Sequence, residues 1–365
     1  MTNAKPLYLQ IYDDLRISIR NQSYSPGDLL PSEKSICERY SASRPTVARA
    51  LKMLSEEKLI ERRAGFGTQV LAPEQSSLTA GLLLPQIMET EIFQPIAASI
   101  INAGITSELQ ISSPYELNRP QDRKAVTLSQ AEQFIHKKVN GVFFAPLENI
   151  PDPQSFNRSV IDRLTSQGIQ VVLLDRDIYP WPRQTPYDLI GIDNIEAGYT
   201  MANHLLEMGC HQLAFVSQEN PAMTVKLRKI GTREALIHNG LSARSLLRIH
   251  YDIEQPAEAA KQLLKANVDG ILCSNDATAA SILRAMFDLG ARIPEQIKVC
   301  GFDDVKYASL LSIPLTSYKQ PCEDIGRIAV ETMIHRIQHP ESPPHRIALQ
   351  GNLIARSSTA RCRPQ

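Results

Sequence analysis

The structure of the amino-terminal part of the chain is predicted from residues 26–70, PGDLLPSEKSICERYSASRPTVARALKMLSEEKLIERRAGFGTQV. Ser32 occupies an N-cap position in front of a short helix, where serine is favoured. A second helix is expected from Arg44, because Ser43 can cap it and Pro45 falls in its first turn, where a missing N–H costs nothing. Two short helices joined by so tight a turn form a helix-turn-helix.

The sequence on either side of these helices adds a third helix and a wing. Residues 7–22 have apolar side chains at helical spacing. Residues 59–63 and 68–71 flank the tetrapeptide Ala64-Gly65-Phe66-Gly67, which predicts a glycine-tipped hairpin. We therefore expect a winged helix-turn-helix.

Charge is concentrated in this part of the chain. Lysine plus arginine and aspartate plus glutamate balance at 39 each overall. Residues 34–63 nevertheless contain eight basic and four acidic residues, which leaves this window at +4 and the remainder at −4. Arg44, Thr46 and Arg49 lie at the start of the second helix, the end that enters the DNA major groove in such motifs. A solvated basic helix is the alternative interpretation of any one of them.

A different pattern begins near residue 80. Short apolar runs that end in polar or proline residues alternate with helical periods such as 196–208 and 277–289. Such runs are typical of strands buried on both faces, so we expect an α/β architecture with parallel sheet. Ligands bind at the carboxyl ends of the strands in these sheets. The runs are GLLLP (81–85), GVFFAP (141–146), IQVVLLD (169–175), LIGID (189–193), QLAFVS (212–217), GILCSND (270–276) and IKVCGFDD (297–304).

The two patterns meet at a short polar stretch, Ala72-Pro73-Glu74-Gln75-Ser76-Ser77, which is typical of a linker. We predict a DNA-binding domain over residues 1–73, a linker over 74–79 and an effector and dimerisation domain over 80–365. A length of 365 residues is in the range of two or three domains.

Composition and motifs predict a cytoplasmic location and a non-catalytic role. The six cysteines lack zinc-site or disulfide spacing, as expected in a reducing compartment. Charged residues such as Asp13 and Arg16 interrupt any signal peptide, and no apolar run is long enough to span a membrane. The sequence has no HExxH, GxSxG, phosphate-binding glycine loop or dinucleotide-binding GxGxxG. We therefore expect no enzymatic activity, no cofactor and no metal.

Residues 26–70 resemble the winged helix-turn-helix of GntR-type bacterial regulators, through the patterns P-G-x-x-L-P-S-E, S-R-x-T-V-x-x-A-L and G-x-G-T. The resemblance implies a dimer on a near-palindromic double-stranded operator. It also implies that the hairpin tip reaches the minor groove. Lys34 replaces a frequent arginine, so its DNA contact would be a point charge. The residues that the resemblance assigns to DNA are Lys34, Arg44, Thr46, Arg49, Gly65 and Gly67.

From about residue 80 to 357 the chain resembles the lactose-repressor and ribose-binding-protein superfamily. The matching strings include VVLLDRD, IGIDNIEAGYTMANHLLEMG, ILCSNDATAASILRAMFDLGARIPEQIKVCGFDD and PLTSYKQP. The resemblance implies two α/β lobes joined by three crossings, with ligand in the cleft between them. The combination resembles the arabinose-repressor type of hybrid.

Several polar residues close the predicted strands, and their chemistry suits a small sugar. Carboxylates, guanidinium groups and amides match hydroxyl groups, which both donate and accept hydrogen bonds. Aromatic faces suit the C–H face of a sugar ring. The resemblance places the polar contacts of a monosaccharide at Asp175, Arg176, Arg228, Asn275, Asp303 and Gln320, and its ring-packing residues at Phe93 and Phe302.

Four of these assignments have a plainer alternative. Asn275 could be a turn residue, Asp303 a helix cap, Arg176 a salt-bridge partner between lobes and Phe93 a core residue. For other residues the plainer alternative is favoured. Asp193 and Asp276 are expected to cap helices. The segment 179–188, which contains the only tryptophan, could shape the cleft rim, but a solvated loop is favoured.

These observations predict a ligand-responsive transcription regulator, a homodimeric repressor of carbohydrate utilisation genes that a small sugar releases from its operator. Charges buried in the cleft without partners would be costly. The empty cleft is therefore expected to stay open, and sugar to close it through hinge crossings near residues 300–320. Alternatives are a regulator that uses its ligand as corepressor or activator, a sensor of a non-sugar metabolite, a periplasmic sugar-binding protein and a sugar-processing enzyme.

Overall fold

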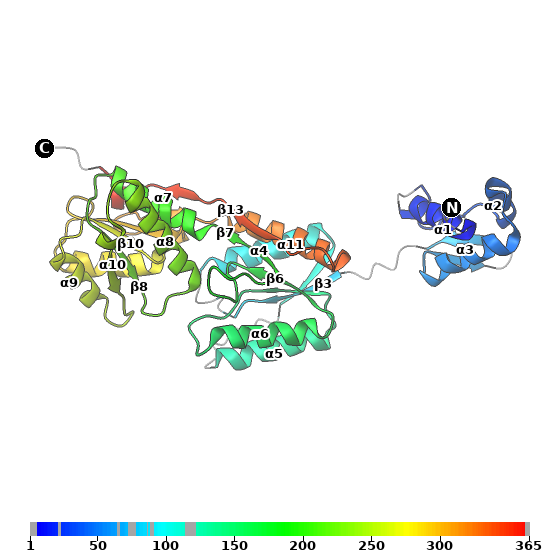
Figure 1. Cartoon of the computed structure of the whole chain (residues 1–365), viewed down its shortest axis with the longest axis horizontal. Helices are drawn as coiled ribbons and strands as arrows, with labels where there is room; N and C mark the ends of the chain where they lie inside the picture. Colours follow the sequence, from blue (N-terminus) through cyan, green and yellow to red (C-terminus); the bar gives the residue numbers. More distant parts are fainter. Residues whose placement is uncertain are drawn as a thin grey trace. The chain divides into compact units, whose positions relative to one another are not determined.

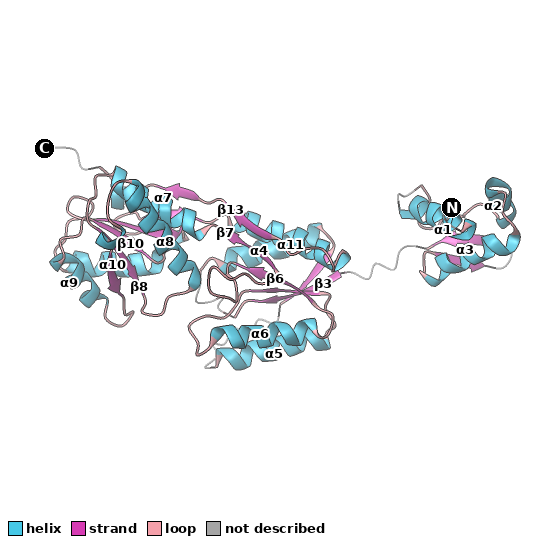
Figure 2. Cartoon of the chain, viewed as in Figure 1, coloured by secondary structure: helices cyan, strands magenta, loops and turns pink. Residues whose placement is uncertain are grey.

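The computed structural model describes residues 6–20, 23–63, 66–71, 78–85, 87, 91–113 and 122–361. Contacts divide the chain into two units, Met1–Ser77 and Leu78–Gln365, each of which combines helices and strands (Figure 2). Within the described ranges, no helix has the length and apolar character needed to cross a membrane. The strand that opens the second unit begins at Leu78, two residues ahead of the predicted domain start. Residues 74–77 of the predicted linker lie outside the described residues.

The first unit is a winged helix-turn-helix, as predicted. Ser32 caps the second helix by accepting a hydrogen bond from the backbone N–H of Ser35 at 3.1 Å. Ser41 then turns the chain in the left-handed conformation, with φ of 49°. Apolar residues of all three helices and both strands form the core. The elements are α1 (Leu7–Arg20), α2 (Glu33–Tyr40), α3 (Arg44–Glu56) and the antiparallel strands β1 (Ile60–Arg63) and β2 (Gly67–Val70).

The second unit consists of two α/β lobes, which confirms the predicted fold class. The sheet of the N lobe is parallel, with strand order β13-β7-β6-β5-β3-β4. Helices α4 and α11 cover one face of this sheet, and α5 and α6 the other (Figure 1). The elements of the lobe are β3 (Leu78–Leu83), α4 (Phe93–Thr106), β4 (Leu109–Ser112), α5 (Arg123–His136), β5 (Gly141–Phe144), α6 (Pro153–Thr165), β6 (Gln170–Leu174), β7 (Asp188–Ile192), α11 (Cys322–Gln338) and β13 (Arg346–Leu349).

The sheet of the C lobe has strand order β14-β12-β11-β10-β8-β9, with only β14 antiparallel to its neighbour among the described strands. Helices α7 and α8 pack closely against each other, and α9 and α10 share the core on the other face. The elements are α7 (Asn194–Glu207), β8 (Leu213–Ser217), α8 (Met223–His238), η1 (Ala243–Ser245), β9 (Leu247–His250), α9 (Pro256–Lys265), β10 (Gly270–Cys273), α10 (Asp276–Asp288), β11 (Lys298–Asp303), η2 (Lys306–Ser309), β12 (Thr316–Lys319), β14 (Asn352–Ile354) and η3 (Ser357–Thr359).

The described chain passes between the lobes three times, at residues 192–194, 319–322 and 349–352. The expectation of hinge crossings near residues 300–320 is therefore wrong for most of that range, because β11 and β12 are paired strands inside the C-lobe sheet. Gln320 does lie in a crossing, the second of the three. The crossings place strand ends of both lobes next to one another.

Candidate functional site

The predicted DNA-contacting residues lie on exposed parts of the first unit. Lys34 on α2 and Arg44 at the start of α3 are exposed, and Thr46 is half-buried. Ser43 occupies the N-cap position of α3, but its hydroxyl bonds the Thr46 hydroxyl at 2.8 Å rather than a backbone N–H. The structure therefore leaves a cationic helix start open to a phosphate or base partner.

Two further DNA-contact predictions concern α3 and the wing. The Arg49 guanidinium of α3 lies over the Tyr8 ring of α1, 3.9 Å from its centroid. This residue therefore also contributes to the packing of α3 against α1. Gly67 has φ of 99°, a conformation that favours glycine. Gly65 lies outside the described residues. Phe66 is 79% exposed at the wing, which the prediction did not include.

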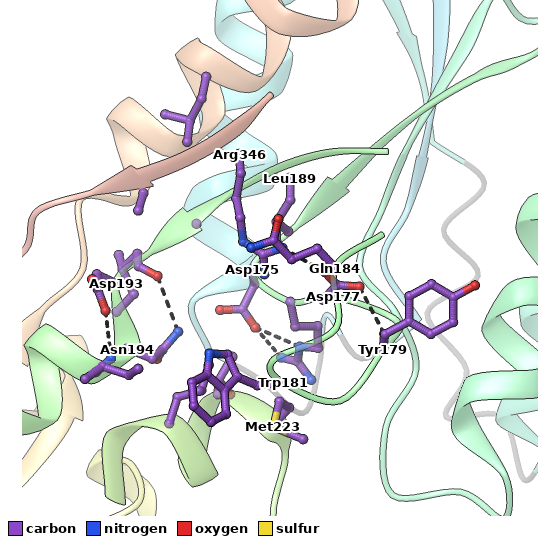
Figure 3. A pocket seen from close by; sticks show the side chains of 18 of the residues that line it. Asp175, Asp177, Tyr179, Trp181, Gln184, Leu189, Asp193, Asn194, Met223 and Arg346 are labelled. Atoms are coloured by element: carbon purple, nitrogen blue, oxygen red, sulfur yellow. Dashed lines mark hydrogen bonds and ion pairs between the residues drawn. The ribbon is translucent and has the colours of Figure 1, made fainter. Parts of the chain in front are cut away.

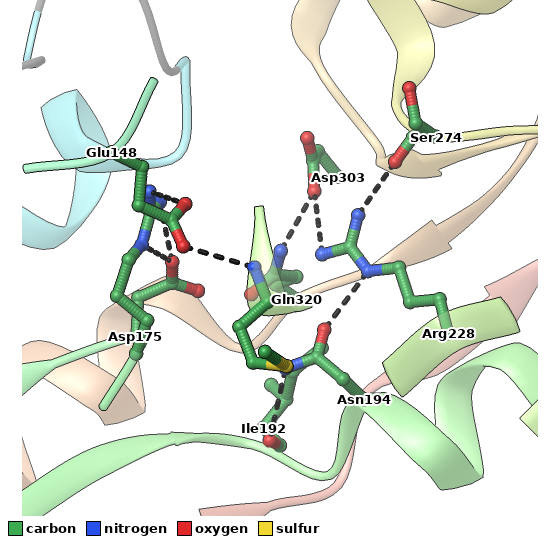
Figure 4. A network of polar contacts seen from close by, with 10 residues as sticks. Glu148, Asp175, Ile192, Asn194, Arg228, Ser274, Asp303 and Gln320 are labelled. Carbon is green, nitrogen blue, oxygen red and sulfur yellow. Dashed lines mark hydrogen bonds and ion pairs between the residues drawn. The ribbon is translucent and has the colours of Figure 1, made fainter. Parts of the chain in front are cut away.

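On the N-lobe side of the cleft, Arg176 is held between two carboxylates (Figure 4). Asp175 follows β6 in the left-handed region, with φ of 67°, and its Oδ2 lies 2.6 Å from Arg176 Nη2. Glu148, in the loop after β5, accepts from Arg176 Nη1 at 2.6 Å. The guanidinium also lies 5.3 Å from the centre of the buried Phe93 ring. The structure thus brings together three of the predicted ligand contacts and adds Glu148 to them.

On the C-lobe side, Arg228 of α8 is the centre of a second polar cluster. Its Nε donates to Asn194 Oδ1 at 2.9 Å and its Nη1 to the Ser274 carbonyl oxygen at 2.8 Å. Its Nη2 lies 3.5 Å from Asp303 Oδ1, and the guanidinium is 4.6 Å from the centre of the Phe302 ring. Burial raises the pKa of Asp303, and the nearby Arg228 cation opposes that rise. The aromatic ring, carboxylate and guanidinium predicted for this lobe are therefore in mutual contact.

Gln320 joins this cluster from the second crossing. Its Nε2 donates to Asp303 Oδ1 at 2.7 Å. Its Oε1 is buried and has no hydrogen-bond partner among the described residues. A buried acceptor of this kind is costly unless a donor reaches it. A ligand hydroxyl would be such a donor.

Asn275 has a structural task that agrees with its plainer alternative. Its Oδ1 accepts from the backbone N–H of Thr278 at 2.9 Å and caps α10. Asp193 caps α7, as expected. Asp276 is in the first turn of α10 but is not its cap. Its buried carboxylate instead accepts from the Val305 N–H and the Ser317 hydroxyl.

The expectation that the cleft charges would lack partners is wrong. Asp175, Arg176 and Arg228 are at most 7% exposed, yet each is paired with a charged group of the protein. Arg176 does not bridge the lobes, because both of its carboxylates come from the N lobe. The desolvation argument for an open cleft therefore does not hold.

Two other hydrogen bonds do connect the lobes. Glu148 Oε1 accepts from the backbone N–H of Met223, the first residue of α8, at 3.0 Å. The Tyr307 hydroxyl in η2 donates to Glu91, ahead of α4, at 3.0 Å. The lobes are thus held together by contacts of the protein itself.

A pocket of about 310 Å³ adjoins the Asp175–Arg176 pair (Figure 3). The segment 179–188 contributes Tyr179, Trp181, Arg183 and Gln184 to its wall. The segment is an exposed loop, as expected, with Trp181 55% exposed, and it also lines this pocket. The lining also includes Met223 and Leu227 of α8, and Arg346 and Ile347 of β13.

Sequence reasoning missed three polar partners at the site: Glu148, Asn194 and Ser274. Each follows a predicted strand, at GVFFAP, LIGID and GILCSND, so position at a strand end was a usable signal for all three. The sequence did not predict which groups contact Arg176 and Arg228, because these three partners lie far from the two arginines along the chain.

Two parts of the chain match known protein families. Residues 7–70 match the model of bacterial regulatory proteins of the gntR family, and residues 202–359 match that of the periplasmic binding protein-like domain. The chain therefore joins a segment that matches the gntR family of regulatory proteins to one that matches the periplasmic binding protein-like domain.

The chain is also similar to individual transcription repressors and to solved structures of regulators. The chain is 25% identical over 362 residues to the arabinose metabolism transcriptional repressor of Halalkalibacterium halodurans, covering 93% of each chain. It is 26% identical to the ribose operon repressor of Escherichia coli, over 62% of this chain and 67% of that protein. A LacI family regulator from Enterococcus faecium, solved with bound ribose, has a TM-score of 0.65 at 22% identity and covers 78% of this chain and all of its own. The operator-bound lac repressor dimer has a TM-score of 0.64 at 19% identity, over 78% of this chain and 95% of that one.

Proposed function

We propose that this chain is a sugar-responsive transcription repressor that acts in the cytoplasm as a homodimer on a near-palindromic operator. The observation that supports it best is the polar cleft of the second unit. There Asp175 pairs with Arg176 in one lobe and Arg228 with Asp303 in the other. Gln320 donates to Asp303, and its buried Oε1 has no donor among the residues that the structure describes. A compound rich in hydroxyl groups supplies donors and acceptors together.

The relatives support the same proposal. The arabinose and ribose repressors are named for carbohydrate regulation, and the first of them matches this chain over both units. Within this proposal the DNA-contacting residues are Lys34, Arg44, Thr46 and Arg49, with the glycines of the wing, Gly65 and Gly67. We expect the protein to release its effector chemically unchanged.

The proposed mechanism couples the cleft to DNA through the two lobes. Sugar binds to groups of both lobes and so favours one arrangement of them. In a dimer, a change in that arrangement alters the separation of the two recognition helices, and operator affinity changes with it. The coupling works only if sugar has different affinities for the two arrangements.

The test combines DNA selection with ligand binding. Full-length protein is used to select duplexes from a random library, and retention of a selected duplex is measured with and without each of a panel of pentoses and hexoses. We expect at least one sugar to weaken retention and to be recovered chemically unchanged. Failure to select any duplex, or retention that is the same with every sugar, would overturn the proposal.

The second candidate has the same architecture and the opposite sign, with sugar as a corepressor. It is favoured by the cross-lobe hydrogen bonds of Glu148 with Met223 and of Tyr307 with Glu91, which already hold the lobes together. If this closed arrangement binds operator, a sugar that fits it would strengthen DNA binding. Tighter retention of the selected duplex in the presence of sugar would establish this alternative.

A further inference from the structure

The paired charges around Arg176 and Arg228 add up to −1, beside a pocket whose wall also includes Arg183 and Arg346. Arg176 lies between Asp175 and Glu148, at 2.6 Å from each, and Arg228 faces Asp303 (Figure 4). In this described network two cations are therefore matched by three carboxylates. All of them are largely buried, with side chains no more than 13% exposed. Such charges are screened by salt much less than charges at a surface.

Three helix starts of the C lobe are occupied by side chains, whereas α4 and α11 of the N lobe begin at Phe93 and Cys322 without a side-chain cap. A helix N-terminus is an ordinary phosphate-binding feature, because its free N–H groups point at the ligand. At α8, Glu148 accepts the hydrogen bond of the Met223 N–H at 3.0 Å. At α7, Asp193 accepts from the N–H groups of Ile195 and Glu196. At α10, Asn275 is the cap. Two of these three starts are thus filled by carboxylates, which repel a phosphate.

We propose that the effector is an uncharged polyhydroxy compound, a free sugar rather than a sugar phosphate, and that Glu148 excludes the phosphorylated form. This inference rests on the proposed function and narrows the class of ligand. A phosphate group has a charge of about −1.5 to −2 at neutral pH. To reach the start of α8 it would have to displace Glu148 from both Met223 and Arg176, and then lie beside Asp175. Hydroxyl groups meet no such repulsion, and they can donate to the buried Gln320 Oε1.

Glu148 also determines how many N–H donors of Arg176 remain available to a ligand. An arginine with a single carboxylate partner keeps donors for a second anion, because its guanidinium has five N–H groups. Here Asp175 contacts Nε and Nη2, and Glu148 takes Nη1. Two carboxylates therefore already contact Arg176, the cation that would otherwise attract a phosphate. Of these two, Glu148 comes from a separate loop.

The test uses matched pairs of probes on the full-length protein by calorimetry at low ionic strength: ribose with ribose 5-phosphate, arabinose with arabinose 5-phosphate, and glucose with glucose 6-phosphate. We expect at least one free sugar to bind and its phosphate to bind at least tenfold more weakly. In Glu148→Gln this gap should shrink by threefold or more, because the amide oxygen can still accept from Met223 while the charge is gone. Glu258→Gln, which removes an exposed carboxylate on α9, should leave the gap unchanged.

The outcomes separate the two proposals. A sugar phosphate that binds the unaltered protein as tightly as its free sugar would overturn this inference and leave the proposed function standing. If the difference in affinity between a free sugar and its phosphate is the same in Glu148→Gln as in the unaltered protein, Glu148 does not exclude the phosphate. The comparison in the unaltered protein decides the class of ligand even if the variant does not fold. Binding of neither member of any pair would overturn the proposed function, and this inference with it.

Discussion

A Cβ atom added to Gly198 on α7 would lie 1.9 Å from the backbone carbonyl oxygen of Arg228 on α8. The contact is reciprocal, because a Cβ at Gly231 on α8 would lie 1.8 Å from the carbonyl oxygen of Ile195 on α7. Backbone therefore packs on backbone where these helices meet. The residue that this contact positions is Arg228, the centre of the C-lobe cluster.

Gly198→Ala should separate the two helices and displace Arg228. We expect it to lower the free energy of unfolding by about 1–3 kcal/mol, the usual cost of overpacking a core, and to weaken sugar binding as well. Chemical denaturation and calorimetry measure the two effects. Glu207→Ala, at an exposed position near the end of α7, is the control and should change neither. Unaltered stability and affinity in Gly198→Ala would mean that the helix contact does not position the site.

Arg228→Ala should abolish the response to sugar and leave operator affinity intact, because Arg228 lies in the cleft unit and not in the DNA-binding unit. The change also leaves Asp303 buried without its cation, which typically costs about 3–5 kcal/mol. Folding is therefore checked by circular dichroism, and Gln320→Met provides a companion variant that removes the buried acceptor without removing a charge. Arg244→Ala, on the surface of the C lobe, is the control. A normal sugar response in both cleft variants would exclude this cluster from ligand binding.

Much of this site could be predicted from the sequence, because the last residues of parallel strands lie at the same edge of a sheet. Asp175 follows β6 and Asp303 ends β11, as the apolar runs predict, and both have positive φ values, 67° and 105°. Backbone strain of this kind clusters at functional sites. The pattern of short buried runs and helical periods was also enough to predict an α/β architecture with parallel sheet, whereas the two lobes were predicted from the family resemblance.

The partners of the charged groups could not be predicted in the same way. Glu148, Arg176 and Met223 meet only when two loops and a helix start converge, and no local pattern specifies that approach. The sequence left Arg176 as a possible bridge between lobes, whereas both of its carboxylates belong to its own lobe. The same limit applies to Trp181, which lies on an exposed loop as expected but also lines a pocket whose lining includes residues from distant segments.

Arg44→Ala should weaken binding to a selected operator by about 1–3 kcal/mol if Arg44 reads a base edge. Its side chain is exposed at the start of α3, the part of such a motif that reaches base edges. Fluorescence anisotropy on the selected duplex and on a random duplex measures the effect. Lys34→Ala is the comparison, because a phosphate contact should weaken both duplexes alike and reduce the salt dependence. An equal loss on both duplexes for Arg44→Ala would reduce it to a backbone contact.

Asp276 should make the protein less stable as the pH rises from about 4 to 8. Burial, with a smaller contribution from Asp303, raises the pKa of Asp276 from 3.8 to about 8. The folded protein therefore holds this proton in a range where the unfolded chain has lost it, so raising the pH favours unfolding. The contribution is at most about 1.4 kcal/mol per pH unit.

Urea denaturation between pH 5 and pH 8 measures this dependence. Asp276→Asn keeps an oxygen for the Val305 N–H and should flatten the slope by the contribution of one proton. Asp288→Asn, at an exposed carboxylate near the end of α10, should leave it as it is. A slope that persists unchanged in Asp276→Asn would show that its proton is not bound more tightly in the folded state.

The central claim is that a sugar held between the two lobes changes how tightly the dimer holds its operator. The most direct measurement is the dissociation constant of the full-length protein for a selected duplex, by fluorescence anisotropy, across a titration of the free sugar that calorimetry shows to bind. We predict that the constant rises at least tenfold and then saturates at the concentrations at which the sugar binds. A dissociation constant that stays the same while the cleft fills would contradict the account.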